Sequence, residues 1–175
     1  LEAAPFEVRP VLQEVCDTLS NQALDKGLEL ICRIDQRMPR LIVGDELRLK
    51  QILYNLIGNA IKFTDSGEIE VVVRPSAPGE NGFPNLLSIE IRDTGIGIPQ
   101  ELQKHIFDNF WQADNADVRG YGGTGLGLAT AFDSVQQAGG TIDVVADRIT
   151  RLDGGFGSTD TSFTTFQQVG GDPVS

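Results

Sequence analysis

Apolar residues recur at helical spacing near the start of the chain. They stand at positions 8, 11, 12, 15, 19 and 23, the period of one buried helix face. Pro10 fits the first turn of such a helix and Gly27 ends the pattern, which predicts an amphipathic helix over residues 11–24. Residues 28–34 then alternate between apolar and polar side chains, so we expect a half-buried strand there.

The strongest pattern covers residues 45–63, with Asp45 as N-cap and a turn at residues 65–67 after its end. At 100° per residue, the apolar positions cover one broad arc, which we expect to be the core face: Leu49, Ile52, Leu53, Leu56, Ile57, Ala60 and Ile61. The polar positions gather in a narrow stripe along its edge: Arg48, Gln51, Asn55, Asn59 and Lys62. This pattern predicts a long helix with one distinct polar edge.

Strands and helices interleave along the rest of the chain. We expect strands over 68–74 and 86–93, a short helix over 100–106, a helix over 125–137, a strand over 141–146 and a last strand within 159–167. Residues 169–175 have the composition of a linker. The fold class is therefore α/β or α+β, a two-layer sandwich with helices on one face of a mixed sheet.

Composition and charge narrow the possible partners. The chain has 175 residues, 40% hydrophobic and 22% charged, which is ordinary for one globular domain. Its 14 Lys and Arg against 25 Asp and Glu give a net charge of −11, which argues against a surface for nucleic acid or anionic membrane. No apolar run reaches the roughly 18 residues of a membrane span. Because the chain starts at Leu1 rather than Met, we expect a fragment of a longer protein.

The two cysteines fall in different elements, Cys16 in the first helical pattern and Cys32 in the strand pattern that follows. They form no CxxC motif and have no histidine cluster nearby. We therefore expect two small buried hydrophobic side chains in a reducing compartment, rather than a disulfide or a metal site.

The polar stripe is unusual because asparagine is a weak helix former, by roughly 0.7 kcal/mol relative to alanine. Asn55 and Asn59 stand one turn apart on it. An amide oxygen is a hard ligand, and Mg²⁺ in nucleotide sites takes few ligands from the protein. Asn59 is thus a candidate Mg²⁺ ligand, with Lys62 one turn on as a positive charge for phosphate.

Asp93 ends the apolar face of a predicted strand, where a carboxylate needs a partner. Two interpretations stay open. Asp93 caps the turn made by Thr94 and Gly95, or it accepts a hydrogen bond from the exocyclic amine of adenine. In the second case Gly95 and Gly97 would let the backbone approach a flat ring closely.

A glycine-rich segment, residues 120–128, leads into the helix predicted over 125–137. Glycine costs about 1 kcal/mol in a helix, so Gly125 and Gly127 indicate a close approach to the backbone, and helix N-termini bind phosphate. Residues 112–123 are long for a connection, which indicates a lid. The G-x-G-x-x-G match at 120–125 follows a polar run instead of a strand, which argues against a Rossmann site.

The order of these motifs resembles one family. Asn55-x-x-x-Asn59-Ala60-x-Lys62-Phe63, Asp93-x-Gly95-x-Gly97, Phe107-x-x-Phe110 and the run from Gly123 to Leu128 follow one another. They are similar to the catalytic and ATP-binding domain of sensor histidine kinases, in the GHKL superfamily, and look most like the hybrid kinases. The resemblance covers nearly the whole chain. It implies a Bergerat fold with a mixed sheet of about five strands under about three helices.

The resemblance also implies roles residue by residue. Asn55 and Lys62 would be the catalytic residues that contact phosphate, Asn59 would coordinate Mg²⁺, and Asp93 would bind the adenine N6 amine. The other residues of the implied ATP site are Phe63, Gly95, Gly97, Ile98, Phe107, Phe110, Thr124, Gly125, Leu126 and Gly127.

The implied function is that of a histidine autokinase domain over residues 1–168, with 169–175 as linker. It would bind Mg-ATP and donate the γ-phosphate to a histidine on a separate phosphoacceptor and dimerisation domain of the same protein, which is not among these residues. A response-regulator receiver domain would follow downstream. The alternative is a nucleotide-sensing or partner-docking module that binds ATP without phosphotransfer. The implied location is cytoplasmic, without direct membrane contact, in a parent for which an inner-membrane sensor is one candidate.

Three features of the sequence bear on differences from the wider family. The single histidine, His105, lies on the polar side of the predicted short helix, so we expect a surface residue and no phosphoacceptor. Asn55 stands where hydrolysing relatives typically have a glutamate that activates water. After Gly157-Ser158-Thr159, three further residues precede Phe163, so the hydroxyl that approaches Asp93 stays open.

Overall fold

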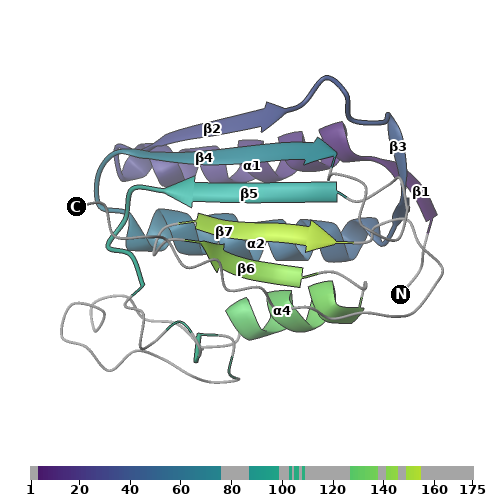
Figure 1. The fold of residues 1–175 in the computed structure, drawn as a ribbon. Helices are drawn as coiled ribbons and strands as arrows, with labels where there is room; N and C mark the ends of the chain where they lie inside the picture. The colour runs from purple at the N-terminus through teal and green to yellow at the C-terminus, as the bar shows by residue number, and fades with distance from the viewer. Residues whose placement is uncertain are drawn as a thin grey trace, which may run out of the picture.

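In the part of the chain that the structure describes, five strands form a central sheet, and helices pack on one of its faces (Figure 1). The computed structural model describes residues 4–75, 87–98, 103, 105–106, 108, 127–137, 141–145 and 149–154. The helices are α1 (Val8–Asp25), α2 (Glu46–Phe63) and α4 (Gly127–Gln137). The strands are β1 (Ala4–Glu7), β2 (Glu29–Ile34), β3 (Leu41–Gly44), β4 (Glu68–Pro75), β5 (Leu87–Asp93), β6 (Thr141–Val145) and β7 (Ile149–Gly154).

The sheet is mixed, with strand order β2-β4-β5-β7-β6. β2 and β4 are parallel, and the other neighbouring strands are antiparallel. β1 and β3 form a separate antiparallel ribbon. α1 packs against β2, α2 against β4 and β5, and α4 against α2 and β6. The predicted two-layer α/β sandwich and its mixed five-stranded sheet are therefore confirmed.

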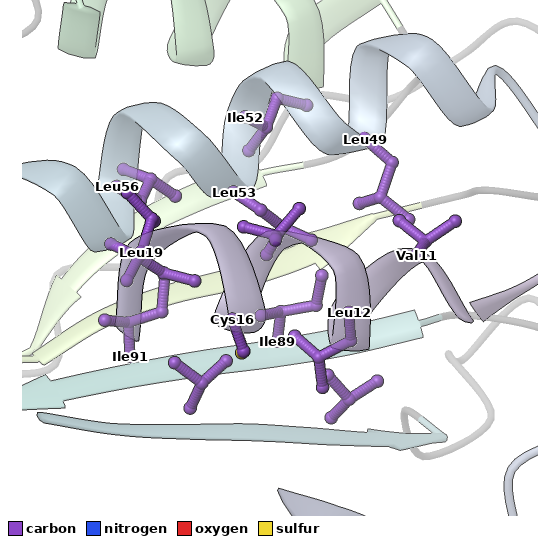
Figure 2. Packing of buried hydrophobic residues seen from close by; sticks show 14 of the residues in the cluster. Val11, Leu12, Cys16, Leu19, Leu49, Ile52, Leu53, Leu56, Ile89 and Ile91 are labelled. Atoms are coloured by element: carbon purple, nitrogen blue, oxygen red, sulfur yellow. The ribbon is translucent and has the colours of Figure 1, made fainter. Parts of the chain in front are cut away.

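The hydrophobic core lies between the sheet and the helices α1 and α2. Figure 2 shows buried residues of α1, α2 and β5 gathered in one hydrophobic cluster, among them Leu12, Leu53 and Ile89. Each of the seven residues predicted for the core face of α2 is buried. Burial of apolar surface stabilises the fold by about 25 cal/mol per Å². The fold is therefore most stable when this face of α2 points into the core, and this preference fixes the rotation of α2 about its axis. The polar stripe must then lie along the edge of the helix.

Charged side chains occupy the opposite face of the sheet. Arg92 donates to Glu90 and Glu70, and Arg74 also pairs with Glu90. These residues alternate with buried Val71, Ile89 and Ile91, because successive side chains of a strand point to opposite faces. Within the described part of the chain, no helix combines the length and hydropathy that a membrane span requires.

Three strands were not expected from the sequence. β1 and β3 are four residues each, too short for a period of two to stand out. β7 lies between β5 and β6, although the apolar residues of its sequence ITRLDG, Ile149 and Leu152, stand three positions apart and so do not follow the period of two that is typical of a strand. The strand predicted within 159–167 lies outside the described residues, as does most of the short helix predicted over 100–106.

The prediction for the cysteines was wrong, because Cys16 of α1 and Cys32 of β2 form a disulfide. Cys16 is buried, whereas Cys32 lies on an edge strand and is exposed. The two residues are separated by 16 positions and belong to elements that pack together. Their proximity is a tertiary property, which neither the helical nor the strand pattern contains.

Reduction of this disulfide should destabilise the fold. A crosslink that closes a loop of this length removes conformational entropy from the unfolded chain, worth about 3 kcal/mol. Thermal unfolding with and without a reductant measures the effect, and we expect a lower melting temperature in the reduced sample. The variant in which both cysteines are serine should not respond to the reductant. Equal melting temperatures of the oxidised and reduced chain would contradict a stabilising bond.

Candidate functional site

The polar stripe of α2 is held at a half-buried edge of the helix. Asp45 caps the helix as predicted, because its Oδ1 accepts a hydrogen bond from the Arg48 backbone N–H at 3.0 Å. Asn55, Asn59 and Lys62 are each partly buried on the same edge. The fold thus presents two amide groups and one ammonium in a row, one helical turn apart.

The C-terminal end of α2 is bound by two other segments. The Lys26 ammonium, just after α1, donates to the carbonyl oxygens of Ile61 at 2.8 Å and Lys62 at 3.0 Å. The Ile96 backbone N–H donates to the Phe63 carbonyl oxygen at 3.2 Å. The end of the polar stripe is therefore next to the loop that begins at Asp93.

Lys62 places a partly buried ammonium beside an aromatic ring. Its ammonium lies 4.7 Å from the centroid of the Phe63 ring. Burial lowers the pKa of the Lys62 ammonium below its usual value, because desolvation disfavours the charged form. A phosphate placed beside it would offset this desolvation, which makes Lys62 suited to contact a negatively charged ligand.

Asp93 has the turn-capping role that its sequence position allowed. Its Oδ1 accepts a hydrogen bond from the Gly95 backbone N–H at 2.9 Å. Because a carboxylate can accept about four hydrogen bonds, this contact is compatible with the adenine-binding prediction. Asp93 is partly buried at the end of β5, opposite Ile69 of β4.

Gly95 stands in a crowded position. A Cβ atom on this residue would lie 2.5 Å from the Phe63 carbonyl oxygen, 2.8 Å from Asp93 Oδ1 and 3.0 Å from Thr64 Oγ1. Gly97 has a φ of 73°, in the left-handed region that favours glycine. The backbone of this loop can therefore follow its path because both positions lack a side chain.

Thr64 is a residue of this site that the sequence did not single out. It is fully buried directly after α2, and its hydroxyl has no hydrogen-bond partner within the described structure. Its oxygen lies beside Gly95. Nothing in the helical pattern distinguishes Thr64 from an ordinary C-cap, so its burial next to the loop required the fold.

Thr94 connects the turn after α2 to the end of β5 through hydrogen bonds of its hydroxyl group. Its hydroxyl donates to the Ser66 carbonyl oxygen at 3.0 Å and accepts from the Glu68 backbone N–H at 3.1 Å. A Cβ atom on Gly67 would overlap Thr94 Oγ1. The close contact of these two segments fixes the position of the end of α2 relative to the Asp93 loop.

Several predicted site residues lie outside the described structure: Phe107, Phe110, Thr124, Gly125 and Leu126. Gly127 begins α4, which packs beside α2. The carbonyl oxygen of Ile98 accepts a hydrogen bond from Gln103 Nε2 at 3.0 Å. His105 is exposed and pairs with Asp108, as expected for a surface residue.

The donor set suits a metal ion that takes most of its ligands from elsewhere. Among the described residues, no group of three or more His, Cys, Asp or Glu side chains could hold a metal ion. The amide of Asn59 offers one oxygen on a partly buried edge. Mg²⁺ keeps several waters and phosphate oxygens in nucleotide sites, so a single amide ligand fits such an ion.

Comparison with known proteins gives the family. Residues 44–169 match the model of the histidine kinase-, DNA gyrase B- and HSP90-like ATPases. The chain belongs to this family. Its matched region begins just before α2 and includes the polar stripe and the loop after β5. The expected resemblance to histidine kinase ATPase domains is thereby confirmed.

Relatives of this ATPase domain include hybrid histidine kinases. The signal transduction histidine-protein kinase BarA of Escherichia coli K12 is 45% identical over 81% of this chain and 15% of its own length. Hybrid signal transduction histidine kinase K of Dictyostelium discoideum is 40% identical over 82% of this chain and 12% of its own length. Sensor histidine kinase GacS of Pseudomonas protegens is 44% identical over 82% of this chain and 16% of its own length. The chain thus spans a small part of these relatives.

Solved structures share the architecture. Full-length ShkA in complex with AMPPNP has a TM-score of 0.75 and 28% identity, over 92% of this chain and 32% of that one. The nucleotide-free catalytic domain of histidine kinase ThkA has a TM-score of 0.72 over 90% of this chain and 97% of that one. At 21% identity, the second likeness concerns the fold alone.

Proposed function

We propose that this chain binds Mg-ATP and donates the γ-phosphate to a histidine on a separate dimerisation and phosphoacceptor domain of the same protein. A receiver domain of a response regulator would take the phosphate next. The domain would occupy residues 1–168, with 169–175 as linker. Its family membership and its hybrid-kinase relatives support this proposal.

One arrangement carries the proposal. The edge of α2 with Asn55, Asn59 and Lys62 ends where the Phe63 carbonyl oxygen accepts from the Ile96 N–H. Residues that could bind phosphate are thus joined to a loop that could bind a purine. In this loop Asp93 offers a carboxylate that accepts hydrogen bonds, and Gly95 has no side chain. ATP is a ligand with both parts, and the ShkA structure was solved with the ATP analogue AMPPNP.

The chain's residues would act through position and charge. Asn59 would hold Mg²⁺, which supplies charge stabilisation on the phosphates when bound. Lys62 would contact a phosphate oxygen, and Asp93 would accept from the adenine amine. Such preorganised charges act where negative charge develops during phosphoryl transfer. A ring nitrogen of the acceptor histidine would attack the γ-phosphorus as the bond to the β–γ bridging oxygen breaks and ADP leaves.

Asn55 would suppress the competing reaction with water. Its amide cannot accept a proton as a carboxylate does, so it would not serve as a general base for water. The isolated chain should therefore bind Mg-ATP in a one-to-one complex and hydrolyse it slowly. His105, which is exposed beside Asp108, should take up no phosphate.

Mixing the chain with an acceptor domain tests this function. With γ-labelled ATP, we expect acid-labile and base-stable label on the acceptor domain and none on the chain itself. Replacing the acceptor histidine with alanine provides the control. Binding of ATP without transfer to any supplied acceptor would favour the nucleotide-sensing alternative, and rapid ATP turnover by the chain alone would favour a hydrolysing ATPase.

A further inference from the structure

Lys26 occupies an unusual place for a lysine that follows a helix. It comes directly after α1, yet its side chain reaches the last turn of a different helix, α2. Its ammonium donates to the carbonyl oxygens of Ile61 at 2.8 Å and Lys62 at 3.0 Å. Both belong to the last four carbonyls of α2, which have no partner within the helix. A cation is also favourable at this end of the helix dipole.

The next carbonyl along α2 is bound by a different segment. The Phe63 oxygen accepts from the Ile96 backbone N–H at 3.2 Å, in the loop that begins at Asp93. Three successive carbonyls of α2 thus join it to two segments that are far apart in the sequence. The last turn of α2 connects the end of α1 with the loop after β5.

This turn contains the residues whose placement matters most for a phosphate. Lys62 has its ammonium 4.7 Å from the centroid of the Phe63 ring, and Phe63 carries the carbonyl that binds the loop. Helix ends fray when their terminal carbonyls have no partners. A frayed last turn would move Lys62 and release the Phe63–Ile96 hydrogen bond together.

We propose that Lys26 is a positioning residue for the nucleotide site. Its ammonium keeps the last turn of α2 helical, so that Lys62 and the Asp93 loop keep their positions relative to each other. Lys26 acts through these groups and does not contact the nucleotide. The inference rests on the proposed function, because it takes ATP to contact both Lys62 and the loop.

Lys50 provides a matched control on the same pair of helices. Its ammonium pairs with Glu14 of α1 at 2.7 Å and with Glu46 of α2 at 3.0 Å. Lys50 therefore also links α1 to α2, but at the opposite end of α2. If linking the two helices were all that Lys26 did, both lysines would have the same effect on ATP binding.

The test measures Mg-ATP affinity of the 175-residue chain by calorimetry, well below the melting temperature of each variant. Lys26→Met keeps most of the side-chain length but removes the donor, and we expect the affinity to fall about tenfold, as for a lost charge-assisted bond. Lys50→Met should change it less than about twofold. Lys26→Arg should restore most of the affinity. Lys26→Gln, which keeps a neutral donor, serves as a second variant and should lie in between.

A double-mutant cycle separates positioning from general stability. In a Lys62→Met background, the Lys26→Met change should cost clearly less affinity than it does in the original chain, because it acts partly through Lys62. Equal losses in both backgrounds, or equal losses for Lys26→Met and Lys50→Met, would overturn the inference. An original chain that fails to bind ATP would instead overturn the proposed function, on which the inference rests.

Discussion

Replacing Asn59 with alanine should abolish phosphoryl donation while the fold survives. In the proposed site, Asn59 supplies the protein's oxygen ligand to Mg²⁺, and the described residues offer no cluster of acidic, histidine or cysteine ligands in its place. Loss of partners in the outer shell of a metal site already costs about 10–100-fold. We therefore expect a loss above about 100-fold, measured as label transferred from ATP to an acceptor domain.

The loss of activity in this variant should not be accompanied by a loss of stability. Asn59 is partly buried in the interior of α2, where alanine is the better helix former by roughly 0.7 kcal/mol. Thermal unfolding should thus show an equal or higher melting temperature. Gln51→Ala is the control, because Gln51 lies exposed on the same stripe and has no assigned role. Normal phosphate transfer by Asn59→Ala, with an unchanged circular dichroism spectrum, would remove Asn59 from the metal site.

Elements with a strong local pattern could be predicted from the sequence. α2 is the best example, because Asp45, the seven apolar residues and the polar stripe all follow from one helical period. The same pattern placed Asn55, Asn59 and Lys62 on one edge before any tertiary contact was known. Asp93 and Gly95 were found because a carboxylate and a glycine at a strand end are exceptional in themselves.

The rest depends on contacts between distant segments. Lys26 looks like an ordinary surface lysine until α1 and α2 are packed, when its ammonium meets the end of α2. The Cys16–Cys32 disulfide requires α1 to lie against β2. β1 and β3 derive their stability from pairing with each other, so neither carries a clear signal alone. Long-range pairing of this kind leaves little trace in a local window of sequence.

Replacing Gly95 with alanine should impair both stability and ATP binding. The new Cβ would meet the Phe63 carbonyl oxygen at 2.5 Å, and neither atom can move away by a side-chain rotation. Overpacking of this kind typically costs about 1–3 kcal/mol. The simplest relief is a shift of the loop away from α2, which would also lengthen the Phe63–Ile96 hydrogen bond and displace Asp93. We expect ATP affinity to fall by more than about tenfold.

Gly58→Ala makes the same chemical change where the structure leaves room for it. A Cβ on Gly58 would meet nothing within 4 Å, and alanine in a helix interior is better than glycine by about 1 kcal/mol. Gly58→Ala should therefore raise the melting temperature while Gly95→Ala lowers it. Calorimetry below both melting temperatures then isolates the binding effect. If Gly95→Ala melted early but bound ATP as before, Gly95 would serve the fold without shaping the purine site, and an unchanged melting temperature would contradict the close contact with Phe63.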